Sequence, residues 1–132
     1  MVSRDSSKQI NKNKNIFQSL GHAISGILRL VKEERNFKLD LFIIIFTVIL
    51  GILLKVRINQ WLWLFVAFFA VIEAEVVNSI IENIVDLIVG PKFNDLAKRA
   101  KDIAAGGVLI SAIFAFFVGI LIFVPEIIKL FN

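Results

Sequence analysis

Three long apolar stretches, separated by short polar segments, dominate the pattern of hydrophobic and polar positions along the chain. They cover residues 39–56, 61–89 and 103–124. A helix needs roughly 20 apolar residues to cross the hydrocarbon core of a bilayer. The third stretch contains no charged residue and is followed by Pro125, whereas the second becomes polar after residue 72. This pattern predicts three transmembrane helices.

The segment ahead of the first stretch has a different periodicity. Apolar side chains recur every three or four positions between residues 16 and 31, and polar side chains such as Gln18 and Arg29 take the opposite side. This amphipathic pattern is too polar to cross a bilayer, so residues 15–37 are expected to form a helix in the headgroup interface. A helix packed on a soluble partner is the alternative. Residues 1–14 are expected to be a disordered basic tail.

The composition excludes an ordinary soluble enzyme. The chain of 132 residues is 58% hydrophobic, above the roughly 45–50% apolar content of soluble domains. A single domain of this size, here residues 15–132, cannot hide so many apolar side chains from water. The net charge is +4, and the charged residues flank the apolar stretches, as they do in membrane proteins. No nucleic-acid partner is therefore expected. The absence of cysteine excludes disulfides and thiolate chemistry.

The distribution of Lys and Arg predicts an orientation in the membrane. Eight of these 15 residues precede residue 39, four lie between the second and third stretches, and three remain for the other side. Cytoplasmic segments carry the excess of Lys and Arg, so the N-terminus and the 90–102 loop are expected in the cytoplasm and the C-terminus outside. The sequence thus predicts a multi-pass protein of the cell inner (plasma) membrane.

Acidic side chains interrupt the second apolar stretch. With each helical residue advancing by about 100°, four polar side chains fall on one side of the helix, and Glu73 lies about 160° away from Glu75. The four residues of this polar stripe are Glu75, Asn78, Glu82 and Asp86. A charged residue in the middle of a membrane costs about 2.5–3.5 kcal/mol on insertion scales. Acidic residues at this density indicate a function.

Three interpretations of the polar stripe compete. It could be a hydrogen-bonded seam between subunits or a pathway for protons or cations. It could also be a divalent metal site, because Mg²⁺ prefers carboxylate oxygens and is commonly held by one or two of them together with substrate phosphates. The stripe runs toward a basic segment with Lys98, Arg99 and Lys101, which favours phosphoryl transfer. The chain has neither a Walker motif nor a protein-kinase motif.

Three motifs in order resemble those of a known family. Residues 75–86 (EVVNSIIENIVD) are similar to an ExxN[ST]AIExxVD helix, residues 97–102 (AKRAKD) to an AKD segment, and residues 32–37 (KEERNF) to an NERNF stretch. These are motifs of the prokaryotic diacylglycerol kinases and undecaprenol kinases, which are small integral-membrane lipid kinases. The resemblance runs from about residue 17 to residue 125. The last two motifs are closer to the Gram-positive undecaprenol kinases than to the Gram-negative diacylglycerol kinases.

The resemblance implies a homotrimer with active sites shared between neighbouring subunits. By position, Glu75 matches the catalytic base of the family, and Glu34 and Glu82 match carboxylates that bind Mg²⁺ and ATP. Lys101 and Asp102 match residues that contact the nucleotide. Asn78 and Asp86 match polar residues that support the site.

The chain departs from the family pattern at several positions. Ile80 replaces a small alanine, Glu73 is an additional acid, and Asn15 stands where some relatives have a basic residue that helps to hold ATP. The segment 89–95 (VGPKFND) differs from the PE[FY]H pattern of the family. Its residues Lys92, Phe93 and Asn94 are further candidates for nucleotide contact.

These observations predict an all-α membrane protein that uses ATP and Mg²⁺ to phosphorylate a membrane lipid alcohol at the cytoplasmic interface. Its expected partners are the lipid, ATP and further copies of the same chain. The match to the Gram-positive branch favours undecaprenol as the substrate, with diacylglycerol as the alternative. A more distant alternative is a non-catalytic channel or transporter subunit that uses the same polar stripe to pass cations.

Overall fold

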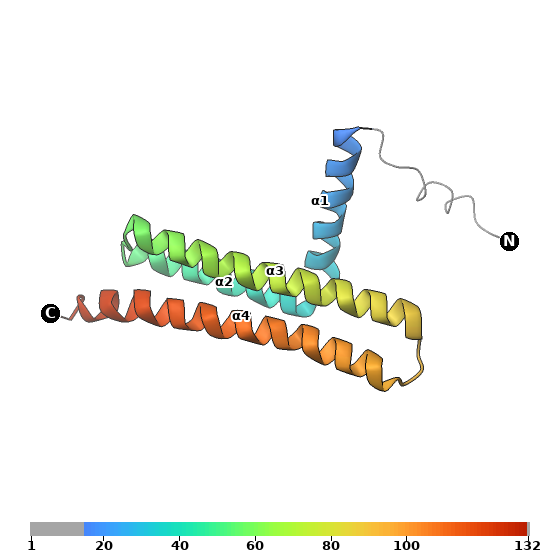
Figure 1. The fold of residues 1–132 in the computed structure, drawn as a ribbon. Coiled ribbons are helices and arrows are strands. Elements are labelled where there is room, and N and C mark those ends of the chain that lie inside the picture. Colours follow the sequence, from blue (N-terminus) through green and yellow to red (C-terminus); the bar gives the residue numbers. More distant parts are fainter. Residues whose placement is uncertain (1–14, 132) are drawn as a thin grey trace. The chain divides into compact units, whose positions relative to one another are not determined.

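The computed structural model describes residues 15–131, which contain four α-helices and no strand. The helices are α1 (Ile16–Glu33), α2 (Arg35–Leu53), α3 (Ile58–Val89) and α4 (Asp95–Ile128) (Figure 1). The chain divides after Glu33 into two compact units, and α1 belongs to the first. The all-helical prediction is confirmed, whereas the predicted disordered tail at residues 1–14 lies outside the described residues.

α1 is a helix with no buried residue. Asn15 precedes it, and its side-chain oxygen accepts a hydrogen bond from the Gln18 backbone N–H at 2.9 Å, which caps the first turn. The helix ends at Glu33 and not at residue 37, because Glu34 has an extended backbone (φ −88°, ψ 118°) and is the N-cap of α2. The location of α1 in a membrane interface stays a prediction.

Three helices are long and apolar enough to cross a membrane, as predicted. α2, α3 and α4 have 19, 32 and 34 residues, and the most apolar windows have mean hydropathies of 2.1, 2.0 and 2.9. At about 1.5 Å per residue, α3 and α4 are each about 50 Å long, which exceeds the roughly 30 Å of a hydrocarbon core. At least one end of each helix therefore extends beyond the apolar layer.

The start of α4 differs from the expected 90–102 loop. The side-chain oxygen of Asn94 accepts hydrogen bonds from the backbone N–H groups of Leu96 and Ala97 at 2.9 and 3.0 Å. This cap satisfies donors of the first turn, so the helix begins at Asp95. The loop is confined to residues 90–94, and the AKRAKD segment is helical. At its other end α4 passes through Pro125 to Ile128.

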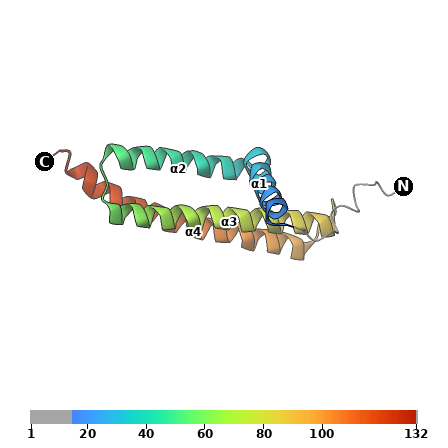
Figure 2. The same ribbon diagram turned by 90° about the horizontal axis from the view of Figure 1, so that it is seen from above.

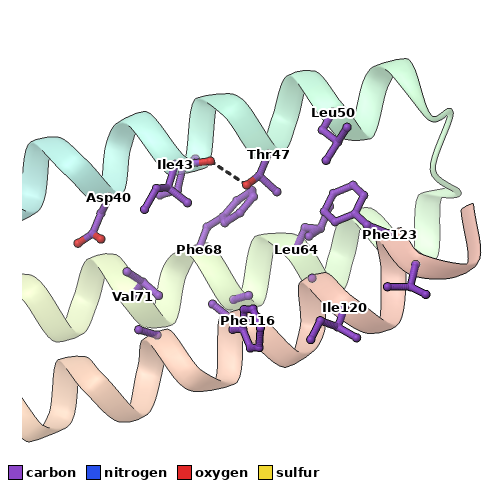
Figure 3. Close-up of a pocket in the computed structure, with 16 residues that line it drawn as sticks. Asp40, Ile43, Thr47, Leu50, Leu64, Phe68, Val71, Phe116, Ile120 and Phe123 are labelled. Carbon is purple, nitrogen blue, oxygen red and sulfur yellow. Dashed lines mark hydrogen bonds between the residues drawn. The ribbon is translucent and has the colours of Figure 1, made fainter. Parts of the chain in front are cut away.

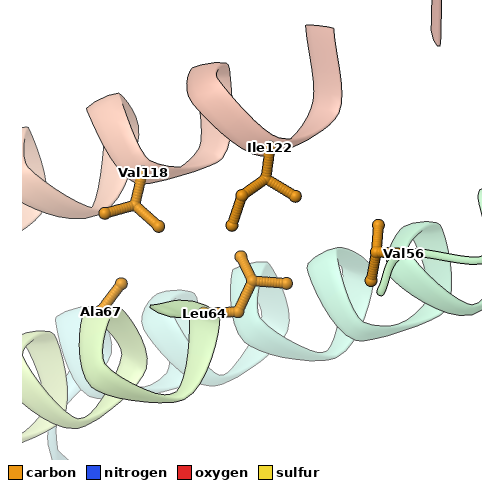
Figure 4. Packing of buried hydrophobic residues seen from close by; sticks show 5 residues of the cluster. All are labelled: Val56, Leu64, Ala67, Val118 and Ile122. Atoms are coloured by element: carbon orange, nitrogen blue, oxygen red, sulfur yellow. The ribbon is translucent and has the colours of Figure 1, made fainter. Parts of the chain in front are cut away.

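α2, α3 and α4 run in alternating directions, and α3 packs along both α4 and α2 (Figures 1 and 2). The buried apolar cluster consists of Val56, Leu64, Ala67, Val118 and Ile122, close to the turn between α2 and α3 (Figure 4). Gly51, near the end of α2, packs closely against the Trp61 ring, since an added Cβ would lie 2.8 Å from that ring. At the opposite end the last turns of α3 meet the first turns of α4, whereas the shorter α2 begins beside the second half of α3 (Figure 2).

Candidate active site

α3 carries the buried polar side chains of the described region, and two of them, Glu75 and Asn78, belong to the polar stripe. Glu75 is 4% exposed, Asn78 is 7% exposed and Ser79 is 2% exposed. The Asn78 side-chain amide donates a hydrogen bond to Glu82 Oε1 at 3.0 Å, which connects successive turns of the stripe. A carboxyl group buried in a long apolar helix is costly without compensating contacts, so this face of α3 is built for polar chemistry.

Two residues at the start of α2 add negative charge to this face. Glu34 and Asp40 interact electrostatically with Glu75, as does Glu82. We call these four residues, Glu34, Asp40, Glu75 and Glu82, the acidic cluster. The pairing of Glu34 with α3 follows from the packing of α2 on α3, which brings residues far apart in the sequence to one place.

Two oxygens in this region are buried and make no hydrogen bond within the described residues: Asp40 Oδ2 and Asn78 Oδ1. Buried polar atoms in proteins are nearly always hydrogen-bonded, so an unpaired one calls for a donor or a cation from outside the chain. Both atoms are acceptors only. The acidic cluster therefore has the chemistry to receive a hydroxyl group or a metal ion.

A second group of predicted residues gathers around the α3–α4 loop. Lys101 Nζ contacts Asp86 Oδ1 at 2.6 Å, and Lys98 Nζ contacts Asp102 Oδ2 at 2.7 Å. These side chains surround a cavity of about 270 Å³, which we call the basic cavity. Three loop residues that were further candidates also line it: Lys92, Phe93 and Asn94. Phe93 is 80% exposed, whereas the side-chain oxygen of Asn94 is occupied in capping α4.

Comparison with known proteins places the chain in a family. The profile of the family described as prokaryotic diacylglycerol kinase matches residues 21–123. The chain is 35% identical to the undecaprenol kinase of Bacillus subtilis over 96% of its own length and 100% of that protein. It is 33% identical to a diacylglycerol kinase of Synechocystis over 88% of its length and 66% of that protein. A diacylglycerol kinase of Helicobacter pylori is 32% identical over 80% of the chain and 81% of that protein.

The chain belongs to the prokaryotic diacylglycerol kinase family. It is therefore a lipid kinase, and its three long apolar helices identify it as an integral membrane protein. Membership confirms the resemblance carried by the three motifs. It also favours an enzyme over the more distant alternative, a non-catalytic channel or transporter subunit.

The described residues of this kinase contain no group of three or more His, Cys, Asp or Glu side chains arranged to hold a metal ion. Glu34 and Glu82 are not brought into such a group, although both act on Glu75. Two carboxylates nevertheless fit Mg²⁺, because this ion is commonly held by one or two carboxylates together with the phosphates of the substrate. The unpaired Asn78 Oδ1 beside Glu82 offers one more hard oxygen.

An apolar groove of about 490 Å³ extends between α2, α3 and α4, and Asp40 lies at one end of it (Figure 3). Apolar side chains from all three helices form its walls, among them Ile43, Val71 and Phe116. The Thr47 hydroxyl donates to the Ile43 carbonyl oxygen at 2.7 Å, so it adds no free polar group. The unpaired oxygen of Asp40 is thus the polar feature of an otherwise apolar surface.

Asp40 is the site residue that sequence reasoning missed. It stands at the edge of the first apolar stretch, where charged residues are ordinary, and it lies outside the three motifs. One signal was available, since Asp40 follows Glu34 by less than two helical turns on a segment that enters the membrane. Only the packing of α2 against α3 identifies it as a neighbour of Glu75.

Proposed function

We propose that this kinase transfers the γ-phosphoryl group of ATP to the hydroxyl group of a membrane lipid alcohol, and that undecaprenol is its preferred acceptor. One observation carries the proposal: Glu75 is a buried carboxylate, 4% exposed, in an acidic cluster beside an apolar groove. The chain matches the undecaprenol kinase of Bacillus subtilis over 100% of that protein, and this match supports the choice of lipid. The relatives named diacylglycerol kinase make diacylglycerol the alternative acceptor.

In the proposed reaction, Glu75 acts as the general base. Its carboxylate accepts the proton of the lipid hydroxyl while the hydroxyl oxygen attacks the γ-phosphorus in line. A new O–P bond forms, the bond between the γ-phosphorus and the β–γ bridging oxygen breaks, and ADP leaves with the electron pair. Burial keeps bulk water from Glu75, which favours the lipid hydroxyl over water as the nucleophile.

The apolar groove is proposed to take the first part of the lipid tail. Its walls are almost entirely apolar, and it is open to the outside of the helices, so the rest of a long chain can stay in the bilayer. Asp40, which carries the unpaired oxygen Oδ2, lies at the end of the groove where the lipid hydroxyl would meet Glu75. The apolar groove would then hold the lipid tail, and the adjacent carboxylates would hold the lipid hydroxyl.

The basic cavity is proposed to bind ATP. Lys98 and Lys101 lie in exposed ion pairs with Asp102 and Asp86, and exposed pairs contribute only about 0–1 kcal/mol. Phosphate oxygens can therefore replace the carboxylates as partners of the lysines at little cost. Phe93 offers an exposed aromatic face for a nucleotide base. Asn94 acts indirectly, because its cap determines where α4 begins and therefore where the two lysines of α4 lie.

Glu34 and Glu82 are the residues that would hold Mg²⁺ together with the phosphates of ATP. When bound, the ion neutralises charge on the transferring phosphoryl group. The hydrogen bond from Asn78 orients the Glu82 carboxylate and fixes which of its oxygens stays free. Asp86 and Asp102 hold the two lysines in place before the nucleotide arrives.

The proposed setting is the plasma membrane, with the N-terminus and the 90–102 segment in the cytoplasm and the C-terminus outside. Cytoplasmic ATP then reaches the basic cavity directly. We further propose that the chain works as a homotrimer, with active sites shared between neighbouring subunits. The support for this proposal is the resemblance of the three motifs to those of the family to which the chain belongs.

Transfer to competing lipids tests the proposed substrate. Purified protein in bilayers is given labelled ATP, Mg²⁺ and equal mole fractions of undecaprenol and diacylglycerol, and the labelled lipids are separated and counted. We expect a modest preference for undecaprenol, because apolar surfaces discriminate by only about 1–3 kcal/mol. Equal or greater transfer to diacylglycerol would contradict the preference, and transfer to neither lipid would contradict the proposed reaction.

A further inference from the structure

The apolar groove has a definite length. On α2 it extends from Asp40 to Leu50, which are about 15 Å apart along a helix that rises about 1.5 Å per residue (Figure 3). The buried apolar cluster follows at the Leu50 end and shares Leu64 with the groove. A tail that enters beside Asp40 can therefore contact the three helices over about half of the roughly 30 Å hydrocarbon core.

The groove is continuous with the acidic cluster, and this continuity identifies its occupant. Asp40 lines the groove and also interacts electrostatically with Glu75. A lipid whose hydroxyl group reaches Glu75 therefore has the groove beside the first carbons of its tail. The volume of about 490 Å³ lies within the range of about 300–1,000 Å³ in which pockets bury a drug-sized ligand. The groove thus suits a section of one substrate tail.

Small residues of α4 form the part of the groove that is closest to α3. At about 100° per residue, Ala112, Ala115 and Gly119 fall within about 60° of one another around the helix. Val118 and Ile122, on the adjoining side of α4, pack with α3 in the buried apolar cluster. The large side chains that α4 adds to the groove follow on the other side: Phe116, Ile120, Phe123 and Val124. The small residues therefore widen the groove at its floor.

Gly119 leaves the most room along this floor, because it has no side chain. An added Cβ at this position would meet no atom within 4 Å, although the residue is half-buried. A larger side chain there would enter the groove and would not push the helices apart. Glycine is less favourable than alanine inside a helix. The missing side chain therefore calls for a reason other than the stability of α4.

We infer that Gly119 is a specificity-determining residue of this kinase, because it gives the apolar groove the width that a branched isoprenoid tail needs. Each isoprene unit of undecaprenol carries a methyl branch, whereas the acyl chains of diacylglycerol are unbranched and narrower. In a close-packed site a difference of one methyl group is felt. This inference rests on the proposed transfer to a lipid alcohol and adds the residue that distinguishes one tail from the other.

Enlarging the side chain at position 119 in two steps tests the inference. Gly119→Ala and Gly119→Leu are assayed in bilayers with labelled ATP and equal mole fractions of undecaprenol and diacylglycerol, so that the two lipids compete for the same enzyme. The ratio of labelled undecaprenol to labelled diacylglycerol should fall slightly with alanine and about tenfold or more with leucine. Gly107→Leu is the control and should leave the ratio unchanged, because Gly107 is equally open on α4 but lines a different groove.

The ratio separates recognition of the tail from damage to the fold. A general disturbance of α4 lowers transfer to both lipids together, and Gly119→Ala introduces a better helix former into open space. A ratio that falls in Gly119→Leu and not in Gly107→Leu supports the inference. An unchanged ratio in Gly119→Leu, or an equal fall in Gly107→Leu, would overturn it and leave the proposed reaction standing. A parent protein that transfers phosphate to neither lipid would overturn the proposed function, and this inference with it.

Discussion

Glu75→Gln removes the proposed proton acceptor and changes the rest of the site little. The amide has almost the shape of the carboxyl group, so it fits a position that is 4% exposed. The substitution also removes a charge that is repelled by those of Asp40, Glu34 and Glu82. Since that repulsion disfavours the native arrangement, we expect the variant to insert and fold like the parent.

The expected loss of activity follows from the role of a single general base. Such a group contributes about 10²–10⁴ in rate, which corresponds to about 3–5 kcal/mol at about 1.36 kcal/mol for each tenfold step. Asp40 is the carboxylate best placed to substitute, because its unpaired oxygen is buried near Glu75. The double variant Glu75→Gln, Asp40→Asn should therefore lose more activity than Glu75→Gln alone.

The assay separates chemistry from binding. A single turnover of labelled ATP onto undecaprenol in bilayers measures the chemical step, and a fluorescent ATP analogue measures nucleotide affinity. We expect the first to fall by at least a hundredfold and the second to change by less than about threefold. Glu33→Gln, the same change at an exposed residue of α1, serves as the control. Near-normal turnover of Glu75→Gln would refute Glu75 as the base.

Two further predictions concern the neighbours of Glu75. Glu34→Ala and Glu82→Ala should each raise the Mg²⁺ concentration needed for half-maximal activity about tenfold or more, with Glu33→Ala as the control; unchanged Mg²⁺ curves for both variants would exclude these residues as metal ligands. Asp40→Asn should raise the KM for the lipid several-fold and leave that for ATP unchanged, because Asp40 lines the apolar groove and not the basic cavity. An effect on the KM for ATP alone would contradict the placement of the lipid headgroup.

The features that the sequence predicted correctly depend on residues that are close to one another in the sequence. The three apolar stretches became α2, α3 and α4 because the hydropathy of a segment determines whether it can cross a membrane. The polar stripe could be read from one helix, since its spacing follows from the helical repeat. The burial of Glu75 and Asn78, and the bond from Asn78 to Glu82, agree with that reading. The family was likewise recognisable from three short motifs.

Helix ends were less predictable, because the local conformation of one residue decides them. Asn94 was considered for nucleotide contact, yet its side-chain oxygen caps α4 and draws Asp95 into the helix. Glu34 interrupts the helix that was expected to continue to residue 37, because its backbone is extended. Hydrophobic periodicity averages over several turns and does not register a single cap or a single extended residue.

Contacts between helices were decided by the tertiary structure alone. Asp40 had the appearance of an ordinary residue at the edge of a membrane span until the packing of α2 on α3 placed it beside Glu75. The polar stripe and Glu73 occupy one helix, but α2 and α4 give them different surroundings, one in an acidic cluster and one in an open groove. A sequence defines which side of a helix a residue takes, whereas the neighbour on that side depends on how all the helices pack.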